Sequence, residues 1–292
     1  MIPFAEGAIV APDKIYASFP LPDGSSGCIC ADAACAWVME ILRDTHRMNT
    51  APGDRRLLDI SLLTQETERE YFPSSPYIRV DLPADEIPQV SLCTMPSDNE
   101  IRVKLARNVM FLALLPLLKK QEIFLFHGGL TVDSNGKGCI LCGPSGVGKS
   151  TAVAKAGTVW EILGDDLMYL TFRNGKCFAQ PGPTWSSYLL EKNRPVDCDV
   201  TRIVEVKNTL ILSRLGEVGI KKLSPMQTGL MVSGSFIEMT TWMSGFLRSP
   251  DLTAELRKAA FDGVKLLTAS TDCHCLTSEL STDLAPYLRA VE

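Results

Sequence analysis

A glycine-rich segment in the middle of the chain combines the residue types that bind nucleotide phosphates. Residues 143–150 read Gly-Pro-Ser-Gly-Val-Gly-Lys-Ser and match the pattern G-x-x-x-x-G-K-[ST] at every position. The glycines let the backbone curl so that N–H groups face a phosphate, Lys149 adds positive charge, and the Ser150 hydroxyl suits Mg²⁺. The alternative is a glycine-rich turn without a ligand. The predicted cofactor-binding residues are Gly143, Pro144, Ser145, Gly146, Val147, Gly148, Lys149, Ser150 and Thr151.

Two adjacent aspartates follow this segment unusually soon. Asp165 and Asp166 stand only 16 and 17 residues after Lys149. A short helix and one strand between them would leave both carboxylates at a strand end beside the phosphate loop. One carboxylate can hold Mg²⁺ and the other can accept the proton of an attacking hydroxyl. Without the loop, an aspartate pair at a strand end would indicate an ordinary turn.

These motifs together resemble a known family. His127, the segment 143–150, Leu163-Gly-Asp-Asp166 and the hairpin directly after them resemble the catalytic domain of HPr kinase/phosphorylase. The Gly-Asp-Asp segment also resembles ATP-dependent phosphoenolpyruvate carboxykinase, which shares that fold. The resemblance covers about residues 123–180 well. It implies that Asp165 is the catalytic base, that Asp166 and Ser150 bind the metal, and that ATP and Mg²⁺ are the cofactors.

A narrower resemblance follows from what the chain lacks. The second signature of HPr kinase, an Ile-Arg-Gly-Leu-Gly-type segment, has no counterpart after the acids, and residues 1–96 do not resemble that enzyme. The chain is more similar to HPr kinase-related proteins of peptide-modification gene clusters, such as the SynChlorMet cassette type. This implies a kinase whose acceptor and partner is a peptide or small protein with a serine hydroxyl. The alternative is a nucleotide-responsive binding module without catalysis.

The expected fold class is α/β, with a phosphate-loop core of the phosphoenolpyruvate carboxykinase/HPr kinase type. We expect an N-terminal α+β module at 1–96 and a nucleotide-binding domain at 97–292, opened by a capping box from Ser97 to Glu100. Alternating apolar residues and Asn-Gly turns predict hairpins in the second part. The predicted strands are 15–29 (a pair), 124–132, 138–142, 159–163, 167–172, 177–180, 201–207 and 209–215, and the predicted helices are 32–46 and 150–156, with two more starting at Pro225 and Pro250.

Composition excludes several classes of function. The chain is 46% hydrophobic and carries a net charge of −5, which does not favour a nucleic-acid partner. The longest apolar run, 109–118, is far shorter than the roughly twenty residues of a membrane span. The first residues lack the basic start of a secretory signal. We therefore expect a cytoplasmic protein, and its oligomeric state stays open.

The ten cysteines suggest reduced thiols and not a disulfide framework. Partial zinc sites can be drawn at Cys28, Cys30 and Cys35 and at Cys273-His274-Cys275. In a strand, however, His274 points away from its two neighbours, so we expect buried thiols and no zinc. Cys139 and Cys142 should point to opposite faces of their strand, which does not favour a redox pair.

Four further residues are weaker candidates. His127 stands before the loop and is either a catalytic residue beside the phosphates or a core or turn histidine. Arg194 and Arg214 either meet transferred phosphate or form surface ion pairs. Trp185, within Pro183-Thr-Trp-Ser-Ser187, is either an apolar wall for the acceptor or a packed core residue.

Overall fold

The computed structural model describes residues 14–62, 77–81, 87–92, 96–183, 199–247, 249–279 and 281–292. Contacts divide the chain into two compact units, Met1–Leu117 with Trp185–Val196 and Leu118–Thr184 with Asp197–Glu292. Both units mix helices and strands, which confirms the α/β class. A division by contacts does not show which part folds alone, so the domain boundary expected at residues 96 and 97 stays a prediction.

The first unit is built on a five-stranded sheet of order β1-β2-β3-β5-β4. The three central strands are parallel and the two outer ones antiparallel to their neighbours. The predicted strand pair and the helix that follows it are confirmed. The elements are β1 Lys14–Pro20, β2 Ser26–Asp32, the 3₁₀ helix η1 Ala33–Cys35, α1 Ala36–His46, β3 Arg55–Leu62, β4 Ile78–Asp81 and β5 Gln89–Leu92.

The long helix α2 (Asn99–Lys119) begins one residue later than a capping box would place it. Asp98 is the residue before the helix, and its Oδ1 accepts from the N–H of Ile101 at 3.0 Å. The predicted cap at Ser97 is therefore wrong. Aspartate caps a helix as well as serine does, so the sequence offered two adjacent caps and the structure uses the second.

The second unit is built on a nine-stranded sheet whose main path runs β6-β10-β11-β12-β8-β7-β9, with β14 beside β12 and β13 beside β14. Parallel pairing joins β8, β12 and β14, and the other pairs are antiparallel. The strands are β6 Phe124–His127, β7 Gly129–Val132, β8 Gly138–Cys142, β9 Glu161–Gly164, β10 Leu167–Arg173, β11 Lys176–Pro181, β12 Val204–Ser213, β13 Gly219–Lys222 and β14 Asp272–Thr277.

A single long antiparallel ribbon links the two ends of this strand order. Only Gly128 separates β6 from β7, and only Asp165 and Asp166 separate β9 from β10. β6 pairs with β10 and β7 with β9, while the N–H of Gly128 donates to the carbonyl of Asp166 at 3.0 Å. The strand predicted at 124–132 is thus bent at Gly128. A Cβ there would lie 2.8 Å from the Leu141 carbonyl oxygen, so only glycine lets the ribbon bend this close.

Two further predictions about strands have different outcomes. The strands predicted at 201–207 and 209–215 are one strand, β12, with a register shift between Val206 and Asn208. Asn208 interrupts the apolar pattern because its buried amide donates to the Val291 carbonyl at 2.7 Å. The two predicted hairpins are confirmed, and the turn between β10 and β11 has positive φ at Asn174 and Gly175.

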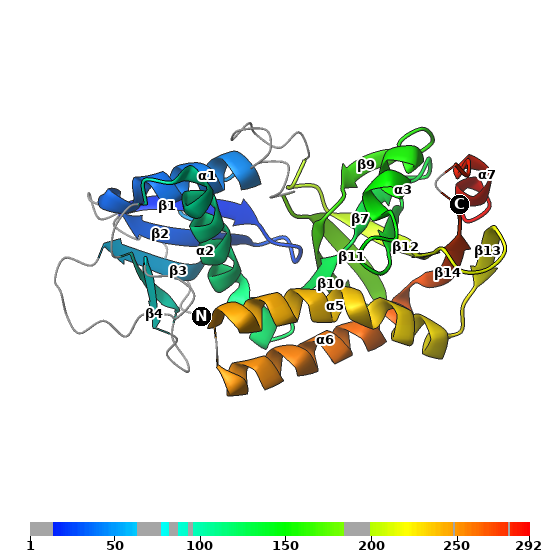
Figure 1. Ribbon diagram of the computed structural model, residues 1–292. Helices are drawn as coiled ribbons and strands as arrows, with labels where there is room; N and C mark the ends of the chain where they lie inside the picture. Colours follow the sequence, from blue (N-terminus) through cyan, green and yellow to red (C-terminus); the bar gives the residue numbers. More distant parts are fainter. Residues whose placement is uncertain are drawn as a thin grey trace. The chain divides into compact units, whose positions relative to one another are not determined.

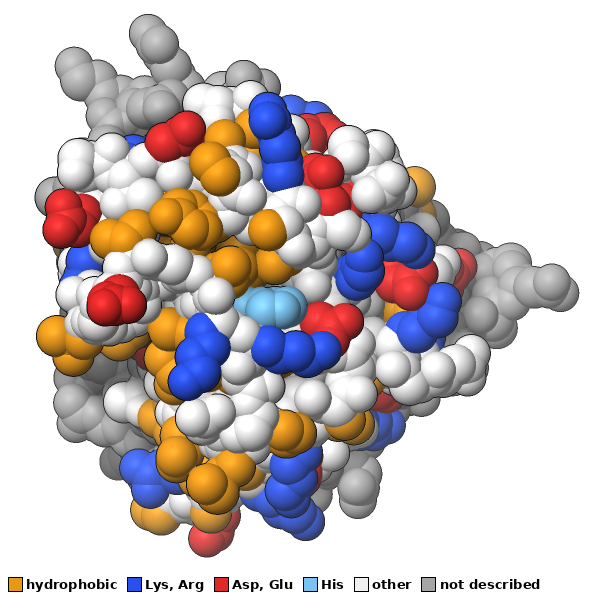
Figure 2. Space-filling view, turned by 90° about the vertical axis from the view of Figure 1, so that its right-hand side faces the viewer, with side chains coloured by type: hydrophobic (Ala, Val, Ile, Leu, Met, Phe, Trp, Pro, Cys, Tyr) orange, Lys and Arg blue, Asp and Glu red, His pale blue; other side chains and the backbone are white. Residues whose placement is uncertain are grey.

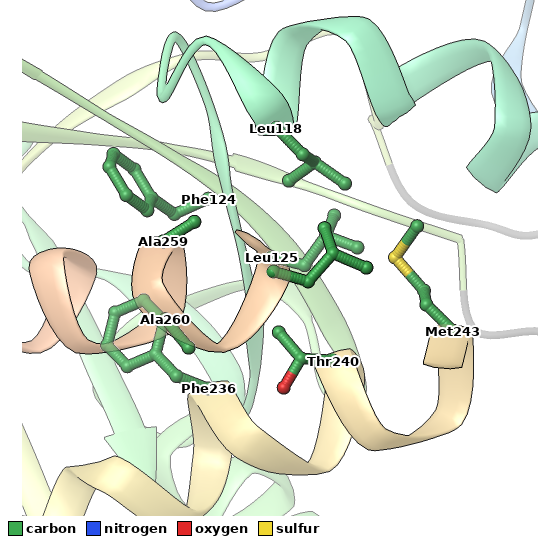
Figure 3. A pocket seen from close by; sticks show the side chains of 9 residues that line it. Leu118, Phe124, Leu125, Phe236, Thr240, Met243, Ala259 and Ala260 are labelled. Carbon is green, nitrogen blue, oxygen red and sulfur yellow. The ribbon is translucent and has the colours of Figure 1, made fainter. Parts of the chain in front are cut away.

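Helices cover both faces of the second sheet (Figure 1). On one side α5 (Pro225–Leu247) and α6 (Pro250–Ser270) lie against each other and against β6. Figure 3 shows Phe236 of α5 beside Ala260 of α6, with Phe124 and Leu125 of β6 packed above them. On the other side α3 (Lys149–Ala156) and α7 (Ala285–Arg289) close a second core. Both predicted helix starts are confirmed, and Ser249 caps α6.

Within the described ranges, no helix is both long and apolar enough to cross a membrane.

Candidate functional site

The glycine-rich loop lies between a buried strand and a helix, as the motif requires. It leaves β8 at Cys142 and enters α3 at Lys149, and Gly143, Gly146 and Gly148 all have positive φ (149°, 77° and 96°). Residues other than glycine rarely adopt such φ values, so the curl of the loop depends on the glycines at these three positions. The resulting turn points backbone groups toward the start of α3, where an anion is favoured.

The side chain of Lys149 folds back onto the beginning of the loop. Its side-chain Nζ donates to the carbonyls of Gly143 (3.1 Å) and Pro144 (3.3 Å), and the residue is only 9% exposed. A buried ammonium needs such partners because its charge is costly to remove from water. An anionic ligand at the loop would offer the same ammonium a stronger, charged acceptor. The two loop carbonyls therefore fix the position of the ammonium.

Four strands bring their carboxyl ends to one edge of the second sheet. β12 and β14 are parallel to β8, and β9 runs the same way because both β8 and β9 are antiparallel to β7. The loop after β8, the aspartates after β9 and the segments after β12 and β14 therefore share that edge. Ligands of open α/β sheets bind at such an edge.

His127 stands between two carboxylates from different elements. Its Nδ1 lies 2.6 Å from Oε2 of Glu238 in α5, and its Nε2 lies 3.5 Å from Oδ1 of Asp166. A carboxylate can only accept, so Nδ1 carries the proton toward Glu238 and Nε2 faces the aspartate. The structure thus brings together His127 and Asp166, both predicted site residues. Asp165 is the adjacent residue in the same bend and is half-buried.

Glu238 is the site residue that sequence analysis missed. It lies 111 positions after His127 and reaches it only because α5 packs along β6. A signal was nevertheless present: Glu238 is the only charged residue in the 23 residues of α5. A single carboxylate in an otherwise uncharged helix is worth treating as a candidate.

Arg214, predicted to meet phosphate or to form a surface ion pair, braces the loop, and its contact with phosphate stays a prediction. Its Nε donates to the Val147 carbonyl at 2.9 Å and its Nη1 to the Ser278 carbonyl at 3.3 Å. It therefore ties the phosphate loop to the segment after β14. The other two weaker candidates, Trp185 and Arg194, lie outside the described residues.

Cys139 and Cys142 of β8 lie in two different hydrophobic cores, one on each face of the sheet. Cys139 lies in the core beneath α3 and Cys142 in the core beneath α5 and α6, so the two thiols do point to opposite faces. Burial raises the pKa of both thiols, that of Cys139 well above its ordinary value. Raised pKa values keep a thiol protonated and unreactive at neutral pH.

The second cysteine motif lies on β14. Cys273, His274 and Cys275 pair with Thr209, Leu210 and Ile211 of β12, and Leu210 and Ile211 belong to opposite cores. The histidine and its neighbours therefore alternate between faces, as expected for a strand. Among the described residues, no group of three or more His, Cys, Asp or Glu side chains is arranged to hold a metal ion. The absence of zinc stays a prediction.

Fold and site together define a mixed α/β protein in which a glycine-rich strand-to-helix loop shares a sheet edge with paired aspartates. A family model described as SynChlorMet cassette protein ScmC matches residues 92–284, which is more than half of the chain. The protein therefore belongs to the ScmC family. No curated protein matches the chain. The match includes α2, the loop, the aspartates and Glu238, and its description names a gene cassette and no reaction.

Proposed function

We propose that the protein is a kinase that transfers the γ-phosphate of Mg²⁺-ATP to a hydroxyl, a serine of a peptide or small protein. The observation that carries the proposal is the shared edge: the loop with buried Lys149 follows β8, and Asp165 and Asp166 follow β9, which runs in the same direction. A phosphate site alone would serve any nucleotide-binding protein. Paired carboxylates at the same edge add a metal ligand and a base.

Each residue has a distinct role in the proposed reaction. The loop N–H groups and Lys149 hold the phosphates, and the Ser150 hydroxyl with an Asp166 oxygen forms a donor set that suits Mg²⁺. Bound Mg²⁺ would neutralise charge on the phosphates. Asp165 accepts the proton of the acceptor hydroxyl while the oxygen of that hydroxyl bonds to the γ-phosphorus. The bond from that phosphorus to the bridging oxygen breaks, and ADP leaves.

His127 and Glu238 support this assignment through their contact with Asp166. Glu238 fixes the ring so that Nε2 faces Asp166, which holds both side chains in one orientation. Orientation matters because catalysis of phosphoryl transfer depends mainly on positioning and charge. We assign His127 as a catalytic residue beside the phosphates and Glu238 as the residue that positions it.

The acceptor class draws its support from the family and the surface. The family description names a cassette, and proteins of a cassette can act on one another, which favours a dedicated peptide or small protein as acceptor. On the face shown in Figure 2, lysine and arginine side chains stand among acidic and apolar ones. A mixed face and a net charge of −5 do not favour a nucleic-acid acceptor. Action in the cytoplasm, where ATP is available, belongs to the same proposal.

The test uses the two aspartates, because only a kinase needs a base. Asp165→Asn keeps the shape but cannot accept a proton, so ATP should bind while transfer falls by about two to four orders of magnitude. Asp166→Asn should instead raise the Mg²⁺ concentration needed for half-maximal rate, since an amide is a poorer ligand for a hard cation. The measurement is phosphoryl transfer to a serine-containing peptide, or slow ATP hydrolysis, across a Mg²⁺ titration.

The outcome separates an enzyme from a nucleotide-responsive binding module. Asp133, which accepts backbone hydrogen bonds within the hairpin turn between β7 and β8, offers a matched control at another strand end. Asp133→Asn should leave the rate unchanged. Wild-type rates in both Asp165→Asn and Asp166→Asn would show that the pair is only a turn, and the binding module would then replace the kinase.

A further inference from the structure

A shallow pocket adjoins the phosphate loop on the β12 and β14 side. It is lined by the loop and α3 through Val147, Thr151 and Lys155, and by the segments after β12 and β14 through Arg214, Ser278 and Glu279. Its enclosed space is small and its mouth is open to solvent, so it can contact one edge of a ligand whose remainder lies on the loop.

The strand order gives such a ligand a direction. In the order β14-β12-β8-β7-β9, the loop after β8 lies between the pocket and the aspartates after β9. The γ-phosphate must be near the aspartates if these hold its metal ion and accept the proton. The remaining phosphates then cross the loop, and the nucleoside lies beyond it on the pocket side. This step rests on the proposed kinase function.

We propose that the nucleoside of the bound nucleotide lies against the residues that line this shallow pocket. The guanidinium of Arg214 is a planar cation that stacks on a nucleobase, and its bonds to Val147 and Ser278 already fix its orientation. Apolar side chains of Val147, Leu212 and Leu284 supply contact for the flat base. Glu279 is the one carboxylate among the lining residues and accepts from a ribose hydroxyl, as acidic residues do in other nucleotide sites.

The far wall of the pocket is also held in place. Lys155 of α3 donates to the Thr282 carbonyl at 2.7 Å, and the Glu279 N–H donates to Thr282 Oγ1 at 2.9 Å. Arg214 ties the same segment to the loop through Ser278. A pocket whose walls are fixed before binding loses less conformational entropy when the ligand arrives.

The experiment compares Mg²⁺-ATP with Mg²⁺-tripolyphosphate by calorimetry on the full chain. Both ligands carry three phosphates, and only ATP carries a nucleoside. The wild type should bind ATP at least about tenfold more tightly. Arg214→Lys keeps the charge but loses the plane, so ATP affinity should fall about threefold to tenfold while tripolyphosphate affinity changes by less than about twofold. Glu279→Gln should lower ATP affinity alone.

A distant arginine provides the matched control. Arg173, at the far end of β10 from the aspartates, stacks on Phe178, and Arg173→Lys should change neither affinity. Equal wild-type affinities for the two ligands would overturn the nucleoside pocket and leave the phosphate loop intact. If Arg214→Lys lowers the affinity for both ligands equally, Arg214 only braces Val147. That result would also overturn the nucleoside pocket. If neither ligand binds the wild type, the proposed function itself fails.

Discussion

The two units each contain a buried strand that leads directly into a helix, and the two connections differ. In the first unit β2 passes through the 3₁₀ turn Ala33–Cys35 into α1, with no glycine and no side-chain cap. In the second unit β8 passes through residues 143–148 into α3, with three glycines at positive φ. Each connection has a lysine beside it: Lys14 pairs with Asp32 at the start of the first, and Lys149 at the end of the second donates to carbonyls of its own loop.

The difference shows what a phosphate site requires beyond a strand and a helix. Every helix leaves its first N–H groups without a partner inside the helix, and at α1 the N–H of Ala36 donates to the Ala33 carbonyl of the preceding turn. The first connection contains no glycine, and Lys14 beside it already pairs with the Asp32 carboxylate. In the second, positive φ opens the turn and the lysine is held by uncharged carbonyls. Glycines at positive φ and a lysine held by backbone carbonyls are the features that separate the two.

The largest effect should come from removing that cation. Lys149→Ala should lower Mg²⁺-ATP affinity by about a hundredfold or more, because a charged hydrogen bond to phosphate is lost inside a partly buried site. Calorimetry measures the affinity, and circular dichroism checks the fold. The matched variant Lys14→Ala removes the lysine at the other connection and should leave ATP affinity unchanged. Unchanged ATP affinity in Lys149→Ala would remove the basis of the nucleotide assignment.

A second variant tests how closely α3 must pack behind the loop. A Cβ at Gly129 would lie 2.1 Å from Val153 Cγ2, so Gly129→Ala must push α3 away from β7. We expect a loss of about 1–3 kcal/mol in the free energy of unfolding, measured with urea, together with weaker ATP binding. Gly27→Ala in β2 is the counterpart, where the added atom would lie 2.5 Å from Cδ1 at the end of the Leu57 side chain and 3.1 Å from the Phe19 ring. A larger loss at Gly27 than at Gly129 would contradict this reasoning.

A third prediction concerns how the stability of the first unit depends on pH. His46, the last residue of α1, is fully buried, and burial lowers its pKa from 6.5 to about 3. Between these values the unfolded chain binds a proton that the folded chain does not. Stability is therefore complete above pH 6.5 and falls by about 1.4 kcal/mol per pH unit as the pH drops toward 3. Urea unfolding at pH 7, 6 and 5 measures the slope, and His46→Phe should flatten it by that amount.

The smallest effect concerns Glu238, the residue that positions His127. Glu238→Gln keeps an acceptor for Nδ1 but removes the charge, so the turnover rate should fall about threefold to tenfold with little change in KM for ATP. Glu238→Ala removes the acceptor as well and should be slower still. Glu255 of α6, paired with exposed Lys119, is the matched control. If KM rises while turnover is unchanged, Glu238 affects binding and does not orient the ring.

Sequence determined those features that depend on neighbours along the chain. The phosphate-loop pattern, the Asn-Gly turns, the starts of α5 and α6 and the opposed directions of Cys139 and Cys142 all follow from local geometry. Dihedral preferences and the two-residue period of a strand act within a few positions, so one sequence can reveal them. The adjacency of Asp165 and Asp166 to a strand end belongs to the same group.

Tertiary structure decided how these local features meet. The bend at Gly128, the single strand β12 and the choice of Asp98 over Ser97 depend on which neighbours surround each segment. The contact between Glu238 and His127 spans 111 positions, and Arg214 reaches Val147 across 67. Such contacts form because the apolar faces of α5 and β6, and the parallel pairing of β8 and β12, bury surface together. Burial has no fixed range along the chain, so its partners are set only when the whole unit folds.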